Sequence, residues 1–236
     1  MQQTEEETAR LAAVDSYGLF GADRSELLDG LARIAASAFD VPMASVTLVH
    51  EEQQWFTGSI GLAEPGTSRA VSFSARLLGD PRPLVVPDTR DDPSTRFLPH
   101  VTQTPPIRFY AGVPLIDADG HVLGSVAVFD REPRLVGPAR MELLANVSTQ
   151  ASAHLQALRT SRLLIARTAE LHRRGEKTDD MLTTVSHELR TPTAAMLGYL
   201  EMLAEQPGAA AHRAALARIE RAGQDLIKML ETVLAS

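Results

Sequence analysis

Apolar residues recur at spacings of three and four in the C-terminal quarter of the chain, and this spacing predicts two amphipathic helices. The first runs from about Thr178 to Glu205 and the second from about Ala210 to Ser236, with Gln206-Pro207-Gly208 as the break between them. Each helix would span roughly 40 Å at about 1.5 Å per residue. Matched lengths and a short turn predict an antiparallel helical hairpin.

The first 146 residues show a different pattern, in which short runs rich in β-branched and aromatic residues alternate with polar turns. An amphipathic helix is predicted from Ser25 to Phe39, with Ser25 as its N-cap. Gly58 is expected to end the second of five predicted strands, which lie at 44–49, 54–57, 84–86, 109–116 and 121–130. A hairpin turn at 117–120 joins the last two strands. This order indicates an α+β domain with helices flanking an antiparallel sheet.

A long helix is predicted between these two regions, from Ala139 to about Arg174, because leucine, valine and isoleucine recur there at helical or heptad spacing. It leads directly into the first helix of the hairpin. We therefore predict an N-terminal domain at 1–146, a helical linker at 147–177 and a hairpin domain at 178–236.

Composition narrows the classes of function. The net charge of −7 and the pI of 5.5 argue against a nucleic-acid surface, which needs clustered Lys and Arg. No window approaches about 18 consecutive apolar residues and the N-terminus is acidic, so we expect a cytoplasmic protein without a membrane segment. The absence of cysteine excludes disulfides, thiolate metal sites and thioether-linked chromophores. The histidines other than His187 lack metal-ligand spacing, and no metal site is predicted.

His187 is the residue best suited to chemistry. It falls about 170° from the centre of the apolar stripe of its helix, so its imidazole faces water together with Thr191, one turn further on. A neutral imidazole is a competent nucleophile near physiological pH, and the neighbouring Glu188 could orient the ring or take its proton. Pro192 predicts a bend just after the histidine. The pattern indicates phosphoryl transfer, although a solvated surface histidine without a catalytic role has the same pattern.

The segment Ser186-His187-Glu188-Leu189-Arg190-Thr191-Pro192 resembles the H-box of the sensor histidine kinases of two-component signalling, and the likeness extends from about 169 to the second helix. The resemblance implies that His187 is the phosphoacceptor and that Glu188 is the acid/base residue of autophosphorylation. It also implies that Thr191 positions water for dephosphorylation of a partner. Thr193 stands where the family often has a hydrophobic residue, a position that carries no chemistry. Because each hairpin has an apolar stripe to cover, we expect a homodimer that forms a four-helix bundle.

The N-terminal domain resembles a GAF sensory domain, on segments at 72–75, 86–92, 107–115 and 120–125. The resemblance implies a small-molecule pocket on the sheet face that is covered by long loops such as 87–106. The expected lining is Trp55, Phe73, Arg108, Tyr110 and residues of the 88–100 loop. Aromatic residues on strands, however, more often belong to the core, and the charged Asp88, Arg90 and Arg108 can serve to satisfy loop backbone groups. Ser74 stands where a cysteine is often found, which removes a thiol role. A covalent bilin is excluded, haem or a freely bound small molecule stays open, and the ligand is unknown.

The chain shows no segment that resembles the ATP-binding domain of these kinases. ATP and Mg²⁺ would therefore reach His187 through a catalytic domain outside this chain, and the phosphate would pass to the receiver domain of a response regulator. No cofactor is expected in this chain, which should be inactive by itself. We expect the chain to be part of a protein histidine kinase. A stand-alone histidine phosphotransfer dimer and a non-catalytic GAF scaffold are the alternatives.

Overall fold

The computed structural model describes residues 2–19, 25–173, 194, 216–219, 221–224 and 228. The chain divides into two compact units, Met1–Ser152 and Ala153–Ser236. Most of the predicted helical hairpin lies outside the described residues; within it, residues 216–219 and 221–224 are helical. Among the described helices, none combines the length and the apolar composition needed to cross a bilayer.

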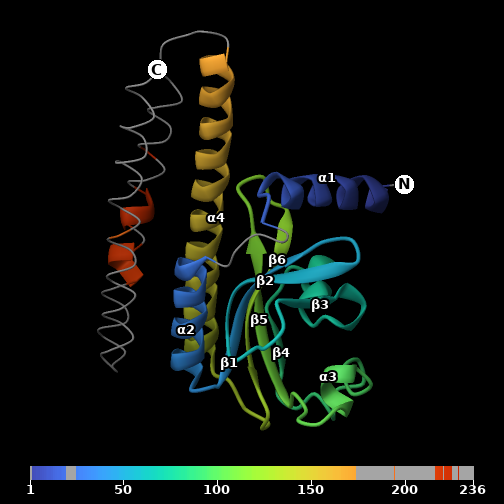
Figure 1. Ribbon diagram of the computed structural model, residues 1–236. Helices are drawn as coiled ribbons and strands as arrows, with labels where there is room; N and C mark the ends of the chain where they lie inside the picture. The colour runs from blue at the N-terminus through green and yellow to red at the C-terminus, as the bar shows by residue number, and fades with distance from the viewer. Residues whose placement is uncertain are drawn as a thin grey trace. The chain divides into compact units, whose positions relative to one another are not determined.

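A six-stranded antiparallel sheet forms the centre of the first unit, in the order β3-β2-β1-β6-β5-β4 (Figure 1). The strands are β1 (Met43–Val49), β2 (Gln53–Ile60), β3 (Gly66–Ser68), β4 (Leu84–Val86), β5 (Phe109–Ile116) and β6 (Val122–Asp130). All five predicted strands are present, and β3 is an additional edge strand. The expectation that Gly58 ends the second strand is wrong, because β2 continues through it to Ile60. The α+β antiparallel architecture is confirmed.

Helix α2 (Glu26–Phe39) confirms the helix predicted from its amphipathic pattern. Its N-cap is Ser25, whose hydroxyl oxygen accepts a hydrogen bond from the Leu28 amide at 3.5 Å. The helix ends at Asp40, which takes the left-handed conformation with φ 55°. The predicted apolar face is buried: Leu27, Leu28, Leu31, Ile34 and Ala35.

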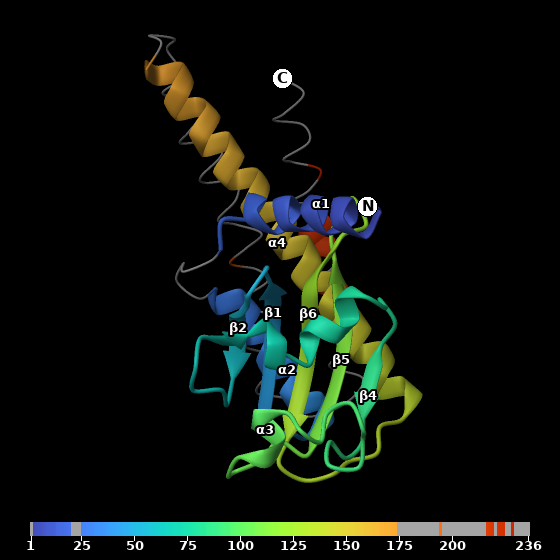
Figure 2. The ribbon, with the colours of Figure 1, turned by 90° about the vertical axis from the view of Figure 1, so that its right-hand side faces the viewer.

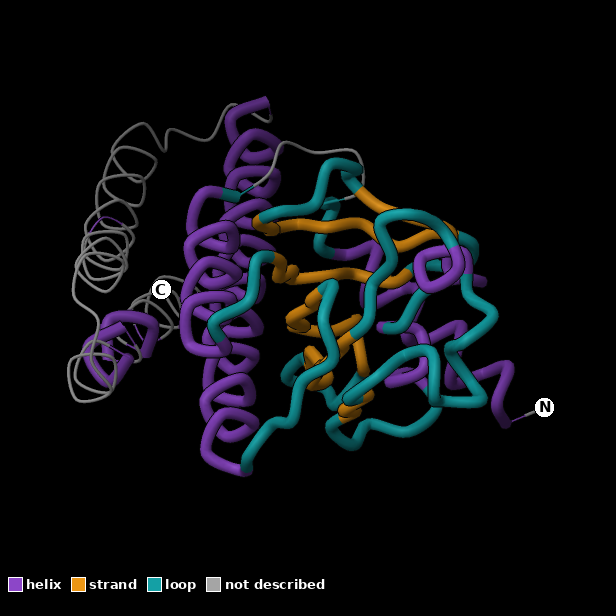
Figure 3. Tube along the Cα trace, turned by 90° about the horizontal axis from the view of Figure 1, so that it is seen from below, coloured by secondary structure: helices purple, strands orange, loops and turns teal. Residues whose placement is uncertain are grey.

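Two helices lie on one face of the sheet, α2 and the N-terminal part of α4 (Pro138–Arg173), as seen in Figures 1 and 3. Leu144, Val147 and Ala151 of α4 are fully buried, and the Ser148 hydroxyl donates a hydrogen bond of 2.7 Å to the Pro114 carbonyl. The bounds of α4 confirm the long helix predicted from residue 139. Its first turns are thus part of the domain core and also lead towards the C-terminal region.

The opposite face of the sheet is covered by short elements and loops: the 3-10 helices η1 (Arg69–Val71) and η2 (Ser74–Leu78) and the helix α3 (Pro99–Thr102) (Figure 3). An aromatic cluster fills the space between them and the sheet. Phe73 stacks on Tyr110 with ring centroids 4.9 Å apart, and Phe129 packs edge-on against Tyr110 at 5.4 Å. Val101 of α3 belongs to the same buried cluster. The 87–106 loop is therefore a packed cover of this face.

A further helix, α1 (Gln2–Ser16), lies at the start of the predicted N-terminal domain and was not predicted from the sequence. It crosses the end of the sheet at which β1 finishes (Figure 2). Val14 and Tyr17 are buried, so this helix and its end contribute to the core of the first unit.

Candidate functional site

The predicted phosphoryl-transfer site lies outside the described residues. It consists of His187, Glu188 and Thr191, with the predicted helix bend at Pro192. Their predicted roles stay predictions. The site geometry that the structure provides is that of the N-terminal domain.

A partly enclosed cavity of about 150 Å³ lies on the loop-covered face of the sheet. Gln54 and Phe56 of β2 and Phe129 of β6 form the sheet side of its wall. The covering side includes Phe73, Ser74 of η2 and His100 of α3. Most of the lining is apolar, and its polar groups include the buried side chains of Gln54 and Ser74 and the half-buried side chain of His100.

Hydrogen bonds hold two of these polar groups in place. The Gln54 amide donates to the Thr67 hydroxyl at 2.6 Å and accepts from the hydroxyl of Ser72, so both ends of the amide are engaged. The Ser74 hydroxyl accepts a hydrogen bond of 2.8 Å from Ser125. Both side chains are more than nine-tenths buried, and their fixed orientation makes this part of the wall preformed.

Tyr110 lies behind Phe73, fully buried, and its hydroxyl has no hydrogen-bond partner among the described residues. Burial raises the pKa of Tyr110 to about 12, an effect that the nearby Ser125 and Ser74 hydroxyls partly offset. Gly112 leaves room for this hydroxyl, because a Cβ at that position would lie 2.2 Å from it. Tyr110 therefore supports the aromatic wall as a neutral residue.

The structure brings only part of the predicted lining together. Phe73 lines the cavity and Tyr110 supports it from behind, whereas Trp55 and Arg108 are not in its wall. Successive residues of a strand face opposite sides, so Trp55 cannot share the face of Gln54 and Phe56. Trp55 instead borders a separate open hollow together with Glu51, Glu52 and Glu64. His100, the last residue of the loop expected in the lining, does line the cavity. Gln54 also lines it but was not predicted from the sequence.

Arg108 is paired with Asp88 in a two-point contact, in which Arg108 Nε lies 2.9 Å from Asp88 Oδ1 and the second guanidinium nitrogen contacts Oδ2. The hydrogen bond from Arg108 is the main cause that holds the pKa of Asp88 below its ordinary value. Thr89 adds a backbone hydrogen bond of 2.8 Å to the Arg108 carbonyl. These contacts join the end of β4 to the start of β5. Asp88 and Arg108 therefore have a structural role in the loop, which was the alternative to a place in the pocket lining.

Asp117, Asp119 and His121 place three metal-ligating groups within 4.8 Å of one another. Asp117 Oδ1 already accepts hydrogen bonds from the amides of Asp119 at 3.0 Å and His121 at 2.8 Å. Gly120 completes the turn with φ 88°. The cluster is thus explained by the tight turn that was predicted between β5 and β6.

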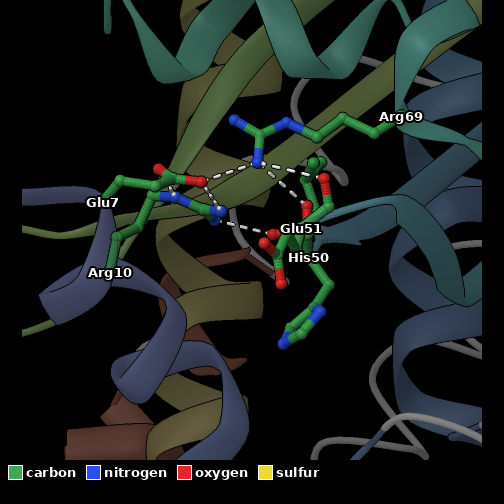
Figure 4. A network of polar contacts seen from close by, with 6 residues as sticks. Glu7, Arg10, His50, Glu51 and Arg69 are labelled. Carbon is green, nitrogen blue, oxygen red and sulfur yellow. Dashed lines mark hydrogen bonds and ion pairs between the residues drawn. The ribbon is translucent and has the colours of Figure 1, made fainter. Parts of the chain in front are cut away.

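A polar network that was not predicted from the sequence fastens α1 to the sheet (Figure 4). Glu7 accepts from Arg10 Nε at 2.7 Å and from Arg69 at 2.6 Å. Arg10 is buried and donates a hydrogen bond of 2.6 Å to the Val49 carbonyl, and Arg69 donates to the His50 carbonyl at 3.2 Å. Arg69 opens η1, which leads to the cavity wall at Val71 and Phe73. One carboxylate therefore connects α1 with the covering side of the cavity.

Replacing Glu7 with glutamine removes its ion pairs with Arg10 and Arg69 and is expected to lower the free energy of unfolding by about 1 kcal/mol at pH 7. The effect is limited to this size because the carboxylate is one-third exposed and water screens its charge. Chiefly through its hydrogen bond with Arg10, the pKa of Glu7 falls from 4.5 to about 2. The stabilisation is thus present above pH 4.5 and is lost as the pH falls towards 2. Urea unfolding of both proteins at pH 7 and pH 3 should show the difference shrinking at the lower pH. Glu6→Gln, an exposed change on the same helix, is the control, and an equal, pH-independent loss in both variants would contradict the network's role.

Comparison with known proteins agrees with this architecture. The profile of the GAF domain matches residues 23–155, and the profile of the His Kinase A (phospho-acceptor) domain matches residues 177–236. A sensory α+β domain followed by a histidine phosphoacceptor region is the domain pair of a sensor histidine kinase. The chain belongs to the GAF domain family and continues into a HisKA phosphoacceptor domain.

Individual proteins and solved structures also match this chain over part of its length. The cyclic di-GMP phosphodiesterase PA2567 of Pseudomonas aeruginosa is 37% identical over 160 residues, which are 66% of this chain and 27% of that protein. The chain thus spans about a quarter of that relative's length. The blue-light absorbing form of the Thermosynechococcus elongatus PixJ GAF domain is 14% identical, with a TM-score of 0.47, 62% of this chain and 91% of that chain covered. The GAF domain of an Acinetobacter phosphoenolpyruvate-protein phosphotransferase is 16% identical, with a TM-score of 0.44. The match covers 75% of this chain and 99% of that chain.

Proposed function

We propose that this chain is the signal-sensing and phosphoacceptor part of a cytoplasmic two-component sensor histidine kinase. His187 receives phosphate from ATP and passes it to an aspartate of a response-regulator receiver domain. The observation that carries the proposal is the Ser186-to-Pro192 motif, which lies within the HisKA match at 177–236. The motif supplies a nucleophile beside a carboxylate, the two groups that phosphorylation of an imidazole requires.

The proposed reaction is an in-line transfer. A neutral ring nitrogen of His187 forms a bond to the γ-phosphorus while the bond from that phosphorus to the ADP oxygen breaks, and Glu188 accepts the proton that the ring loses. Mg²⁺ bound with ATP on the separate catalytic domain neutralises charge on the phosphates. Thr191 is proposed to orient water when the phosphorylated receiver is hydrolysed.

Signal transfer is proposed to run through α4, which is anchored in the first unit by Ser148 and continues to Arg173. The proposed division into domains at 1–146, 147–177 and 178–236 has its first boundary inside this helix. A change in the sensory domain can therefore reach the linker without crossing a flexible joint. We propose a homodimer with a four-helix bundle of hairpins, whose two packings of similar free energy are biased by the sensory domain.

Labelling with γ-³²P-ATP and Mg²⁺ tests the function, in the presence of separately purified ATP-binding domains from several HisKA-type kinases. Acid-labile, alkali-stable phosphate on this chain, followed by its transfer to a receiver domain, supports the proposal. Phosphate that is accepted from several catalytic domains equally well favours the stand-alone phosphotransfer dimer. Absence of label with every catalytic domain, for a chain that light scattering shows to be dimeric, favours the non-catalytic GAF scaffold and overturns the proposal.

A further inference from the structure

The cavity between η2, α3 and the sheet differs in lining and size from the pocket expected from the sequence. We infer that it binds an uncharged, mainly apolar molecule of about the size of a substituted benzene, which carries one hydrogen-bonding group. The inference deepens the proposed sensory role of the GAF domain and rests on it for its biological meaning. Binding itself depends only on the cavity.

Volume sets the size of the ligand. The cavity measures about 150 Å³. An apolar protein cavity of about 150 Å³ accommodates benzene, whereas pockets for drug-sized ligands measure about 300–1,000 Å³. Haem, which the sequence left open, and a nucleotide are both too large for this space. The ligand is therefore restricted to a single small ring or a compact aliphatic group.

The shape of the wall favours a flat ring. Phe73 is fixed between Tyr110, on which it stacks at 4.9 Å, and Phe129, whose ring centroid lies 6.4 Å away. All three side chains are at least 95% buried, so their rings have little freedom to move. Phe56 adds a further aromatic side chain from β2. A planar ligand can pack against these rings with offset or edge-on geometry.

The charge of the lining excludes ions. Glu64 is the one ionised side chain in the wall, and it is exposed at the rim. Burial lowers the pKa of His100, so its imidazole is neutral near pH 7. An anion or a cation that entered would lose its hydration without gaining a buried counter-charge. The cavity therefore selects uncharged molecules.

His100 provides the polar contact. Gln54 is engaged with Thr67 and Ser72, and Ser74 already accepts from Ser125. The half-buried ring of His100 makes no hydrogen bond to the described residues, and only its backbone carbonyl is engaged, by the Ile107 amide at 2.7 Å. A neutral imidazole can both donate and accept a hydrogen bond. A hydroxyl, carbonyl or amide on the ligand would satisfy it.

Four probes with the same ring test the inference on the full chain: benzyl alcohol, toluene, benzoate and benzylamine. Titration followed by NMR or calorimetry should show that benzyl alcohol binds at least tenfold more tightly than either ion. His100→Phe should weaken benzyl alcohol binding about tenfold, the size expected for one lost hydrogen bond, and leave toluene binding within about twofold. Val71→Phe, which fills the cavity from η1, should abolish binding of both.

Equal affinity for benzyl alcohol, benzoate and benzylamine, no binding of benzyl alcohol at millimolar concentration, or unchanged binding by Val71→Phe would each overturn the inference. Thermal unfolding of both variants separates loss of the cavity from loss of the fold. His187→Gln should bind benzyl alcohol as the wild type does. Failure of ligand binding is therefore distinguishable from failure of phosphotransfer.

Discussion

Replacing His187 with glutamine is expected to abolish phosphate incorporation from ATP when a HisKA-type catalytic domain is supplied. Glutamine keeps the polarity and the helix-forming tendency of the position. Its amide nitrogen, however, has no lone pair available for attack on phosphorus, because that pair is delocalised into the carbonyl. We expect labelling to fall at least a thousandfold, to the background of the assay, since no other group replaces the nucleophile. Radiolabel retained after alkali and lost after acid is the measurement.

Two matched variants define the outcome. His172→Gln, a histidine outside the motif, should keep full labelling, whereas Glu188→Gln should slow it by about 10²–10⁴-fold, as loss of a general base does. Equal labelling of wild type and His187→Gln would show that another residue accepts the phosphate. Equal loss in His172→Gln and His187→Gln would show that the assay reports folding or dimerisation instead of chemistry.

The elements with a clear local pattern could be predicted from the sequence. Helix α2 has a preferred N-cap residue, Ser25, and a continuous apolar face, and the β5–β6 hairpin has the Asp117-to-Gly120 turn. Strand β3 is different, because Gly66–Ser68 has three residues and no apolar alternation. It is a strand only because Trp55 and its neighbours in β2 offer it an edge to pair with. Short edge strands of this kind depend on contacts that are distant along the chain.

The cavity could be predicted only in part, for the same reason. Strand alternation separates Gln54 and Phe56 from Trp55, but the loops alone decide which of these two sets faces a ligand. The position of His100 depends on the hydrogen bond between its carbonyl and Ile107, across a loop without periodicity. The network around Glu7 was missed because its partner Arg69 is 62 residues away. Charge pairing at that separation leaves no pattern in the sequence.

Gly58→Ala is expected to lower the free energy of unfolding of the N-terminal domain by about 3 kcal/mol or more, the upper range for overpacking a core. A Cβ at position 58 would lie 2.3 Å from the backbone carbonyl carbon of Leu28 and 2.5 Å from its oxygen. Backbone atoms of a buried helix cannot rotate away as a side chain can. The Thr57 carbonyl also accepts from Ser25, and Asp29 accepts from the Ser59 amide at 2.7 Å, so α2 is held close on both sides of the glycine.

Gly79→Ala is the matched control, because nothing lies within 4 Å of a Cβ there and its φ of −87° suits any residue. It should change the unfolding free energy by less than about 0.5 kcal/mol. Urea unfolding can be followed by the fluorescence of Trp55, the single tryptophan, which lies on the same strand, β2, as Gly58. Similar midpoints for Gly58→Ala and Gly79→Ala would mean that α2 can move away from β2 at little cost. A selective loss in Gly58→Ala would show that the close contact with α2, and not the backbone freedom of glycine, is the reason why position 58 requires glycine.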